Sequence, residues 1–507
     1  MKANIFLAII FFSCFNRAFS QTFPMEVKKG YDYAGIVKIE ENGVLTGYRI
    51  AYEMGKDGKD KNHIINVTDI QGKVIGSTEI SSTKERVLLD YVFNGNNYCF
   101  AYYEADEKKA TCDIYDKTLN KLSTVVFDAL DKRGMFGLAY QTEFKSAYWS
   151  PGSKKVLQPI KNSGFVFSYH DAEEGAKLIM EAFDVSGKKL WKFNATSKNG
   201  KKSFDETECL LVNSKMLVNL VTQRDKKTSF SNFYNYLSFI DLSTGKEIGR
   251  IDETVIKHTF RTRTVRYNEL KDLYYVGGEI YNSKKDSCIG VCIYTISAQG
   301  KVVNEKESLW SSEISKAVSQ ADNTKLDKNT SIYVHEIIPN KEGGITIVGE
   351  QYRRAFNSKV LITSMQGNGS LTKIEIYNIV LLEYDNKMNL LKVEVFDNGK
   401  KNVSLPEGAT GFSTFELGQY VESRYQFNFF KSHIYKDLNG FYCCFSSNTE
   451  KDTCEVVIYE NGKASIKKIP MGSANSWRNV SYQDDRIISH IVDEKKGVVE
   501  LVELKLR

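Results

Sequence analysis

The sequence contains few of the features that identify an enzyme. Its six histidines are scattered, without a His-Glu-x-x-His motif or a close pair, and it has no Gly-x-Ser-x-Gly elbow, Walker loop or Cys-x-x-Cys motif. The sequence therefore contains no motif that indicates a zinc enzyme, a serine hydrolase or a nucleotide-binding enzyme. We predict no catalytic residue, no cofactor and no metal ligand, and we favour a protein that is not an enzyme.

Proline is also scarce, at 6 residues in 507, and the chain has no low-complexity segment. Little disorder is therefore expected beyond the N-terminus. The charge is nearly balanced, with 69 basic against 63 acidic residues and a net charge of +6. Because there is no basic arm and no RNA-binding or zinc-finger pattern, we expect no nucleic-acid partner. A mixed, mildly basic surface favours a soluble exterior.

The N-terminal 20 residues have the pattern of a secretory signal peptide. Lys2 precedes an apolar run over residues 5–12, and Ala18 and Ser20 occupy the small-residue positions before cleavage, which makes Gln21 the first mature residue. The run is too short to span a bilayer, and no second segment of 18 apolar residues follows. We therefore expect an exported protein without a transmembrane segment, periplasmic or extracellular. Lipoprotein anchoring through Cys14 is a minor alternative, because bulky residues precede that cysteine.

Eight cysteines remain after the predicted cleavage, and export permits disulfides. Two sets lie on opposite arms of predicted hairpins: Cys99 with Cys112, and Cys443 or Cys444 with Cys454. The predicted register places neither pair directly opposite, and a bridge needs Cα atoms within roughly 7 Å. We expect most of the eight to be small buried thiols.

A polar turn recurs seven times between β-rich stretches. Aromatic residues make up 12% of the chain, which suits strands. A repeated strand–turn–strand unit is typical of a closed, repetitive β architecture. The turns occupy residues 69–73, 116–121, 184–188, 241–246, 297–301, 385–389 and 460–463.

Two strands joined by a charged loop precede each turn, and an eighth such pair ends the chain. The pairs are 48–53 with 63–67, 98–103 with 111–115, 164–169 with 177–183, 216–222 with 236–240, 273–280 with 290–295, 344–351 with 379–384, 440–446 with 454–459, and 487–492 with 498–504. A third strand follows most turns and a leading strand precedes each pair, which gives the four antiparallel strands of a propeller blade.

We therefore predict an all-β fold, with residues 21–507 forming one β-propeller domain of four-stranded antiparallel blades. Eight blades are favoured over seven. The last pair lacks an outer strand, and residues 23–28 can supply it, which closes the ring and removes two exposed sheet edges. Two β-sandwich domains are the alternative.

Two insertions interrupt the repeat, near residues 304–332 and 352–378. Residues 311–320 have a helical pattern, with Ile314, Ala317, Val318 and Ala321 on one face. Residues 352–377 expand the sixth blade by a long loop or an extra hairpin. Such an insertion can carry binding function or be a tolerated elaboration, and the sequence favours neither.

Residues 182–191, Ala-Phe-Asp-Val-Ser-Gly-Lys-Lys-Leu-Trp, resemble the repeat of quinoprotein-type (PQQ-like) propellers, and residues 241–248 match its turn. The tryptophan of this repeat packs between blades, and Trp191 alone fills that place. Residues 343–350 and 275–279 are similar to inner strands of secreted bacterial propellers, in which glycine lets a strand crowd the narrow axis. The chain as a whole resembles exported propellers of Bacteroidota. The resemblance implies a fold and no activity.

Three groups of residues are candidate ligand contacts. Arg261 and Arg263 share a strand face with Val265. If they lie on an inner strand they can bind an anionic ligand or sugar acid, whereas on an outer strand they face water. The second group lies in the long insertion and the third mixes aromatic and basic side chains, as interface hot spots do, with a surface strand as the alternative. These groups are Arg353 and Arg354, and then Tyr420, Arg424 and Tyr425.

The function favoured by the sequence is that of an exported, monomeric binding or scaffold module for a protein, a glycan or an envelope component, acting through loops on one face. The argument is architectural, because a rigid ring presents variable loops and no catalytic motif is found. The alternative is a polysaccharide-acting enzyme whose carboxylates converge on the central channel from different blades. A quinone-dependent dehydrogenase would need a full set of repeats, and only two partial ones occur.

Overall fold

The computed structural model describes 20–24, 30–41, 44–54, 61–83, 85–127, 156–171, 177–195, 204–224, 233–253, 259–282, 287–319, 330–356, 372–405, 412–424, 426–450, 453–470, 480–483, 486–493 and 498–506. Within these ranges the regular structure is β-strand, apart from the single-turn helices η2 (Trp310–Ile314) and α3 (Ser315–Ser319) and the helix α5 (Thr414–Ser423). None of these helices has the length and apolar content needed to cross a membrane.

The described strands form eight separate antiparallel sheets, numbered here in chain order. Sheets one to four are β2 (Asp32–Glu41), β3 (Val44–Met54), β4 (Lys61–Asp69) and β5 (Val74–Ser82); β6 (Arg86–Phe93), β7 (Tyr98–Glu104), β8 (Lys109–Tyr115) and β9 (Lys121–Phe127); β10 (Leu157–Ile160), β11 (Gly164–Asp171), β12 (Lys177–Asp184) and β13 (Lys189–Asn194); and β14 (Phe204–Val212), β15 (Met216–Arg224), β16 (Phe233–Asp241) and β17 (Glu247–Asp252).

Sheets five to eight continue the pattern, and sheet six has a fifth strand. They are β18 (Thr259–Asn268), β19 (Leu273–Asn282), β20 (Ser287–Ser297) and β21 (Val302–Leu309); β22 (Ser331–Pro339), β23 (Ile345–Phe356), β24 (Thr372–Tyr384), β25 (Leu390–Phe396) and β26 (Lys401–Ser404); β27 (Phe429–Ile434), β28 (Gly440–Ser446), β29 (Thr453–Glu460) and β30 (Lys463–Pro470); and β31 (Val480–Gln483), β32 (Arg486–Asp493), β33 (Val498–Lys505) and β1 (Ser20–Pro24).

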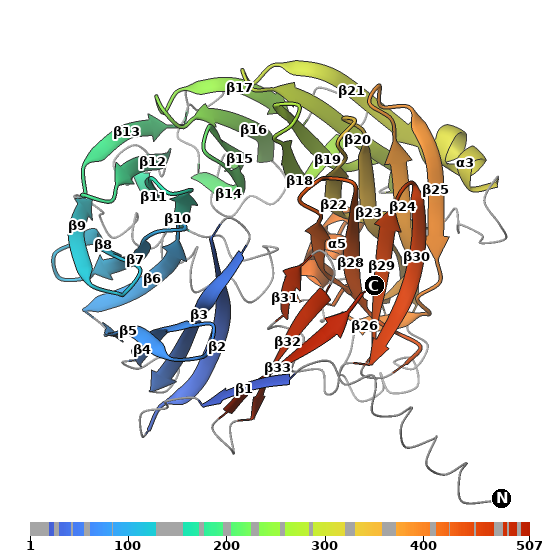
Figure 1. Ribbon diagram of the computed structural model, residues 1–507. Coiled ribbons are helices and arrows are strands. Elements are labelled where there is room, and N and C mark those ends of the chain that lie inside the picture. The colour runs from blue at the N-terminus through green and yellow to red at the C-terminus, as the bar shows by residue number, and fades with distance from the viewer. Residues whose placement is uncertain are drawn as a thin grey trace, which may run out of the picture.

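The sheets follow one another around a common centre, which gives a β-propeller-like fold (Figure 1). The first strand of each sheet lies nearest the centre and is called the inner strand here. All eight predicted strand pairs are the second and third strands of a sheet, and the two-sandwich alternative is wrong.

The two ends of the described chain pair in sheet eight. β1 pairs with β33, from Ser20 opposite Val502 to Pro24 opposite Val498. The pairing segment therefore begins earlier than the predicted residues 23–28.

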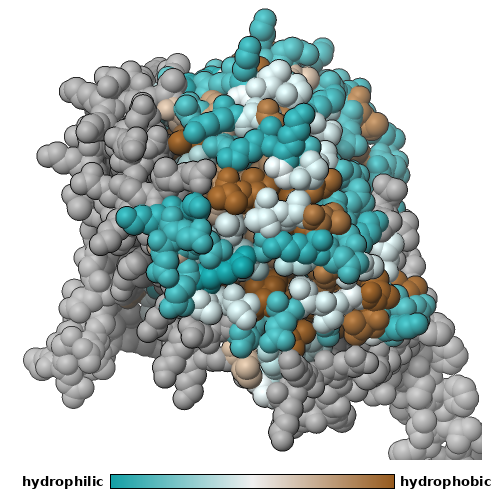
Figure 2. Space-filling model, turned by 90° about the vertical axis from the view of Figure 1, so that its left-hand side faces the viewer, coloured by the Kyte–Doolittle hydropathy of each residue, from teal (hydrophilic) through white to brown (hydrophobic). Residues whose placement is uncertain are grey.

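Burial explains why these segments are strands. The second and third strands have sheets packed on both faces, and β7 is buried over Tyr98–Tyr103. The fourth strands are half exposed, and β5 alternates between partly buried and exposed residues. Exposed Ile75, Leu122 and Leu190 lie on successive fourth strands. Figure 2 faces this flank and shows hydrophobic residues interrupted by hydrophilic ones, as a half-exposed strand requires.

The seven predicted turns each connect the third strand of a sheet to the fourth. In the turn after β12, the Asp184 carboxylate accepts hydrogen bonds from the backbone N–H groups of Ser186 and Lys188 at 2.9 and 3.0 Å. Gly187 supplies the left-handed backbone, with φ of +88°. Together with the Ser186 hydroxyl, these donors lower the pKa of Asp184. The aspartate therefore organises the turn through its own side chain.

Replacing Asp184 with alanine should lower the free energy of unfolding by about 1 kcal/mol, because two backbone donors in an exposed turn lose their carboxylate acceptor. Asp184→Asn keeps an acceptor oxygen and should lose less than half as much. The midpoint of urea unfolding measures both. Equal losses for the two variants would contradict the proposed role of the carboxylate.

Trp191 packs between sheets, as its place in the quinoprotein-type repeat implies. Its indole Nε1 donates to the carbonyl oxygen of Leu242 in the turn of sheet four at 2.7 Å. The ring covers Gly245, where a Cβ atom would lie 2.6 Å from Cδ2 of the indole. Gly245 also has φ of +68°. The turn of one sheet is thus docked on the fourth strand of the sheet before it.

The eight described cysteines are free thiols. Cys99 lies opposite Ile114, and Cys112 lies opposite Ala101, so this pair is diagonal rather than opposed. Cys444 and Cys454 are offset in the same way. Diagonal neighbours have Cα atoms roughly 7–8 Å apart, beyond the usual span of a disulfide. Burial also raises the pKa of Cys99 and Cys454 well above the usual thiol value, which favours unreactive thiols.

Both predicted insertions contain regular structure. The helical pattern near 311–320 corresponds to η2 and α3, with Ile314 buried and Ala317 packed against the same core. The side chain of Val318 and all of Ala321 lie outside the described residues. In sheet six the insertion lengthens the hairpin itself, because β23 and β24 continue to Phe356 and Thr372. Residues 357–371 lie outside the described residues.

Candidate functional site

Helix α5 contains Tyr420 and lies beside residues of the other two candidate groups, and its sequence explains why it forms. Ser413 caps the helix: its hydroxyl accepts from Glu416 N at 3.2 Å, and the Glu416 carboxylate accepts from Ser413 N at 2.6 Å. This is a capping box. Leu417 and Val421, four residues apart, are buried on one face. The surface strand considered for Tyr420 is therefore wrong, because local capping and a 3.6-residue period favour a helix.

The lengthened hairpin and α5 form one structural unit, called the sheet-six extension here. It comprises residues 352–356 of β23, residues 372–377 of β24, β26 and α5. β26 pairs with the lengthened part of β24, with Lys373 opposite Ser404 and Ile376 opposite Lys401. The unit packs around a core that it shares with the inner strand β22, made of Tyr333 of β22 and of Tyr352, Ile374, Ile376, Val403, Leu405, Leu417, Val421 and Phe427.

Six inner strands contain a β-bulge, where the pairing with the second strand skips one residue. Five of the bulges lie at an equivalent place, and that of sheet four lies two residues nearer the turn to the second strand. A bulge turns the extra side chain away from the regular alternation, and bulges are enriched near functional sites. In sheets five and six the extra residue is basic or titratable. The skipped residues are Ala34, Leu89, Leu210, Arg263, His335 and Phe430.

Arg263 forms a buried ion pair with Glu279 of the neighbouring strand. Its Nε donates to the two carboxylate oxygens at 2.7 and 3.0 Å, and Glu279 also accepts from the backbone N–H of Val334 in sheet six at 2.8 Å. The guanidinium lies between rings, 4.3 Å from the centroid of Tyr333 and 4.4 Å from that of Phe415. Burial opposes this charge, but attraction by Glu279 holds the pKa of Arg263 well above its usual value.

Arg261 and Arg263 are therefore on an inner strand. The alternative prediction, an outer strand whose arginines face water, is wrong. The predicted face shared with Val265 is also wrong, because the bulge at Arg263 interrupts the alternation. Arg261 instead binds Glu253 at 3.0 Å and lies 5.2 Å from the ring of Phe415. Both arginines thus contact the first turn of α5.

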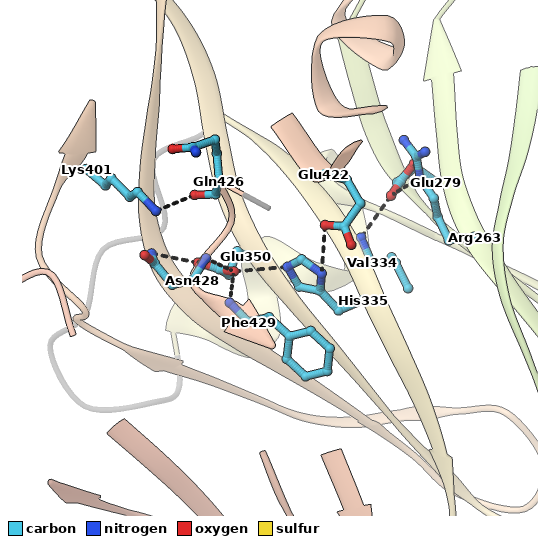
Figure 3. A network of polar contacts seen from close by, with 10 residues as sticks. All are labelled: Arg263, Glu279, Val334, His335, Glu350, Lys401, Glu422, Gln426, Asn428 and Phe429. Carbon is cyan, nitrogen blue, oxygen red and sulfur yellow. Dashed lines mark hydrogen bonds and ion pairs between the residues drawn. The ribbon is translucent and has the colours of Figure 1, made fainter. Parts of the chain in front are cut away.

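His335 takes the equivalent place in sheet six and is bound by Glu350 (Figure 3). Nε2 of His335 lies 3.0 Å from Oε2 of Glu350, and the His335 side chain is 1% exposed. Glu350 also accepts from the backbone N–H groups of Asn428 and Phe429 at 3.0 and 2.8 Å. The ring of His335 stacks on Phe429, with centroids 4.7 Å apart. The fully buried carboxylate of Glu350 therefore orients the imidazole of His335. The aspartate of a Ser-His-Asp triad orients its histidine in the same way.

Glu422 connects this pair to α5. Its Oε2 lies 3.9 Å from Nδ1 of His335, so the imidazole lies between two carboxylates (Figure 3). The Glu422 side chain is 35% exposed, and burial of the rest raises the pKa of its carboxyl, against attraction by His335. Lys401 lies at the other end of the network and donates to the carbonyl of Gln426 at 2.6 Å, and burial lowers the pKa of its ammonium group.

A third carboxylate joins neighbouring inner strands. Glu336 of β22 accepts from Nε of Arg266 in β18 at 2.8 Å and from the hydroxyl of Ser432 in β27 at 3.0 Å. Carboxylates of sheets five and six therefore do lie on or beside the inner strands. Those of Glu279, Glu336 and Glu350 are buried and engaged by donors, which differs from the open arrangement that a glycosidase needs.

The fold does not require charge at these bulges. In sheet two the places of His335 and Glu350 are taken by Leu89 and Tyr103, which pack against a hydrophobic core. Because apolar residues often replace buried ion pairs without loss of stability, the charges of sheets five and six are candidates for function.

The remaining candidates gather on the sheet-six extension. Arg353 lies opposite Glu375 and donates to it at 3.0 Å, while Arg354 donates to the carbonyl of Phe412. The ring of Tyr420 lies 6.4 Å from that of Phe412 and 5.8 Å from the guanidinium of Arg424. Tyr425 lies outside the described residues. Arg354 and Tyr420, from two predicted groups far apart in sequence, thus both lie beside Phe412. Arg353, by contrast, lies on the other face of the β23–β24 hairpin.

Substitution of Ser413 by alanine should loosen α5 without unfolding the sheets. Loss of a helix cap costs about 1 kcal/mol, which corresponds to roughly fivefold faster local opening. Amide hydrogen exchange over 414–423 measures this change. Ser413→Asp retains a capping oxygen and should exchange like the parent. Unchanged exchange in Ser413→Ala would show that packing alone holds the helix.

A model of a family of unknown function, DUF6770, matches residues 1–494. The chain belongs to this family. A search of the curated proteins finds no match to this DUF6770 chain. Within its described residues, no group of three or more His, Cys, Asp or Glu side chains is arranged to hold a metal ion.

Several solved structures have a similar course of the chain at low identity. A quinohemoprotein alcohol dehydrogenase from Comamonas testosteroni is 11% identical, with a TM-score of 0.41, covering 96% of this chain and 76% of that one. The enzyme ADHIIG from Pseudomonas putida HK5 is 10% identical, with a TM-score of 0.42 and coverage of 97% and 76%. A dihydro-heme d1 dehydrogenase is 10% identical, with a TM-score of 0.40 and coverage of 87% and 68%. No activity is transferred from them.

Proposed function

We propose that this DUF6770 protein is an exported, eight-bladed propeller that binds a glycan through the sheet-six extension. Support for eight blades comes from the eight described sheets. Support for closure comes from the pairing of β1 with β33, which joins the two ends of the chain in one sheet. Support for export comes from the signal-peptide pattern of residues 1–20.

The observation that carries the proposal is the packed core of the sheet-six extension. Six buried residues of the extension belong to this core, so the extension is a built structure rather than a loop. Among the described residues, Phe356 is the one exposed large hydrophobic on it, whereas basic and polar side chains are numerous. Protein interfaces have an apolar centre depleted of charge, so this surface fits a polar ligand better than a protein partner.

Binding of the purified protein to an array of oligosaccharides tests the proposal. We expect at least one class to bind, and Tyr377→Ala to weaken that binding at least tenfold, because the Tyr377 ring lies beside two cations of the extension. Arg250→Ala is the matched control, since Arg250 forms a similar ion pair and ring contact on sheet four. An array without a bound glycan, or equal binding by Tyr377→Ala, would overturn the proposal.

One observation favours a second function, hydrolysis of a polysaccharide. The Glu422 side chain is partly exposed, and the pKa of its carboxyl is raised by burial. The buried imidazole of His335 lies 3.9 Å from this carboxyl. A carboxyl that holds its proton can act as a general acid. New reducing ends should then appear when a bound polysaccharide is incubated with the protein, and Glu422→Gln should abolish them while binding persists. Absence of new reducing ends with every bound glycan excludes this function.

A further inference from the structure

A cluster of cations on the sheet-six extension surrounds one carboxylate. Glu375 is 4% exposed, and its oxygens lie 2.5 Å from Nζ of Lys400, 3.0 Å from Nζ of Lys373 and 3.0 Å from Nη2 of Arg353. The hydroxyl of Tyr377 also donates to Glu375. The cluster therefore combines three positive charges, one negative charge and an aromatic ring.

The strands hold this cluster in a fixed arrangement. Arg353 of β23 lies directly opposite Glu375 of β24, and Lys400 directly precedes β26, which pairs with the other edge of β24. The central strand thus carries the carboxylate, and the cations reach it from both sides. Lys373 is held further by the side chain of Asn402 at 2.8 Å. Cations that are already ordered lose less entropy when a ligand binds.

The cluster retains positive charge after this internal pairing. Among these side chains three carry a positive charge and one a negative charge, so the cluster itself has two more positive than negative charges. Burial opposes ionisation of Glu375, but hydrogen bonds from the three cations and Tyr377 lower its pKa far below the usual range, so it stays ionised. Exposed ion pairs contribute little stability by themselves, so stability alone does not account for three cations around one carboxylate. The surplus therefore points to an anionic group outside the protein.

The cations are also open to a ligand. Their side chains are 37% exposed for Arg353, 23% for Lys373 and 44% for Lys400. The guanidinium of Arg353 lies 5.0 Å from the centroid of the Tyr377 ring, and the ammonium of Lys400 lies 5.8 Å from it. An aromatic ring therefore lies beside the two charges that an anion would contact.

We propose that this cluster recognises the carboxylate or sulfate groups of an acidic polysaccharide. The inference rests on the proposed glycan-binding function and adds the chemical class of the ligand. Arginine binds carboxylate and sulfate-like oxyanions through a planar fork of donors, and lysine adds a point charge. Successive acidic sugars would place anionic groups along the extension, and the Tyr377 ring offers an apolar surface to a sugar face.

Isothermal titration calorimetry with the full mature chain tests the inference. The probes are a hexuronic acid oligosaccharide, the same oligosaccharide with its carboxyl groups reduced to alcohols, dextran sulfate and dextran. We expect each acidic probe that binds to do so at least tenfold more tightly than its neutral counterpart, and binding to weaken between 50 and 500 mM salt because the contacts are exposed charges. The two acidic probes distinguish a carboxylate ligand from a sulfate ligand.

Variants locate the binding. Arg353→Ala and Lys400→Gln should each weaken acidic binding at least tenfold, whereas Arg250→Ala on sheet four should bind like the parent. Lys400→Gln keeps most of the side-chain stem at an exposed position, so it tests the charge even where Arg353→Ala perturbs the sheet. Equal binding of acidic and neutral probes would overturn this inference and leave the proposed function standing. Failure of every glycan on the array would overturn both.

Discussion

Replacement of Glu350 with alanine is expected to lower the free energy of unfolding by about 3–5 kcal/mol, as removal of one member of a buried charged network does. Glu350 is fully buried and accepts from His335 and from two backbone N–H groups of the next inner strand. Its loss leaves those donors without an acceptor and removes a contact between sheets six and seven. The midpoint of urea unfolding, read by tryptophan fluorescence, should fall clearly.

Glu342→Ala is the matched control on the same sheet, because Glu342 is exposed and its partner Lys341 lies 3.7 Å away. It should change the free energy of unfolding by less than about 1 kcal/mol. A double-mutant cycle with His335→Leu and Glu350→Leu replaces both members of the pair with apolar residues. The combined loss should be smaller than the sum of the single losses by about 0.5–3 kcal/mol. Additive losses would show that the two side chains do not act as a pair.

The repeated units could be predicted from the sequence because their signals are local. A turn such as 184–188 combines an aspartate that binds its own backbone with a glycine three residues later, and apolar strands flank it. Seven polar turns of related sequence give the strand pairs and their order, although the turns at 116–121 and 385–389 lack glycine and have Leu119 and Met388 at positive φ. The eight predicted pairs are the second and third strands of the eight described sheets.

The charged network could not be predicted in the same way. Whether a strand has a bulge depends on its partner strand, so nothing near Arg263 or His335 marks them as the skipped residues. The arginines of β18 were predicted as candidates, but their partners, Glu253 after β17 and Glu279 on β19, come from other parts of the sequence. Arginine side chains are usually exposed, which favoured the prediction that these two face water. Instead, they form ion pairs with these two glutamates and lie mostly buried.

Helix α5 was missed although the sequence contains its signal. Ser413 and Glu416 have the spacing of a capping box, and Leu417 and Val421 follow at helical spacing. The surrounding strand pattern and the aromatic residue Tyr420 favoured a strand. A capping box therefore indicates a helix even within a repetitive β protein, and such an inserted helix can position the residues of a site.

Replacement of Trp191 with alanine should destabilise the contact between sheets three and four by about 3–5 kcal/mol. The indole is almost fully buried, belongs to the core shared by these sheets and covers Gly245 in the next turn. The substitution leaves a cavity and frees the carbonyl of Leu242. We expect a lower urea midpoint and faster hydrogen exchange in β13 and in the turn at 241–246.

Two further variants separate packing from hydrogen bonding at this contact. Trp191→Phe keeps an aromatic ring but loses the bond from Nε1 to Leu242, and it should cost about 1–2 kcal/mol. Leu190→Ala, at the exposed neighbouring position, should change the free energy of unfolding by less than about 0.5 kcal/mol. If Trp191→Ala is no more destabilising than Leu190→Ala, the sheets do not depend on this side chain. The remaining core residues would then hold the sheets together. The quinoprotein-like repeat would in that case be a similarity of sequence in which the tryptophan does not dock one sheet on the next.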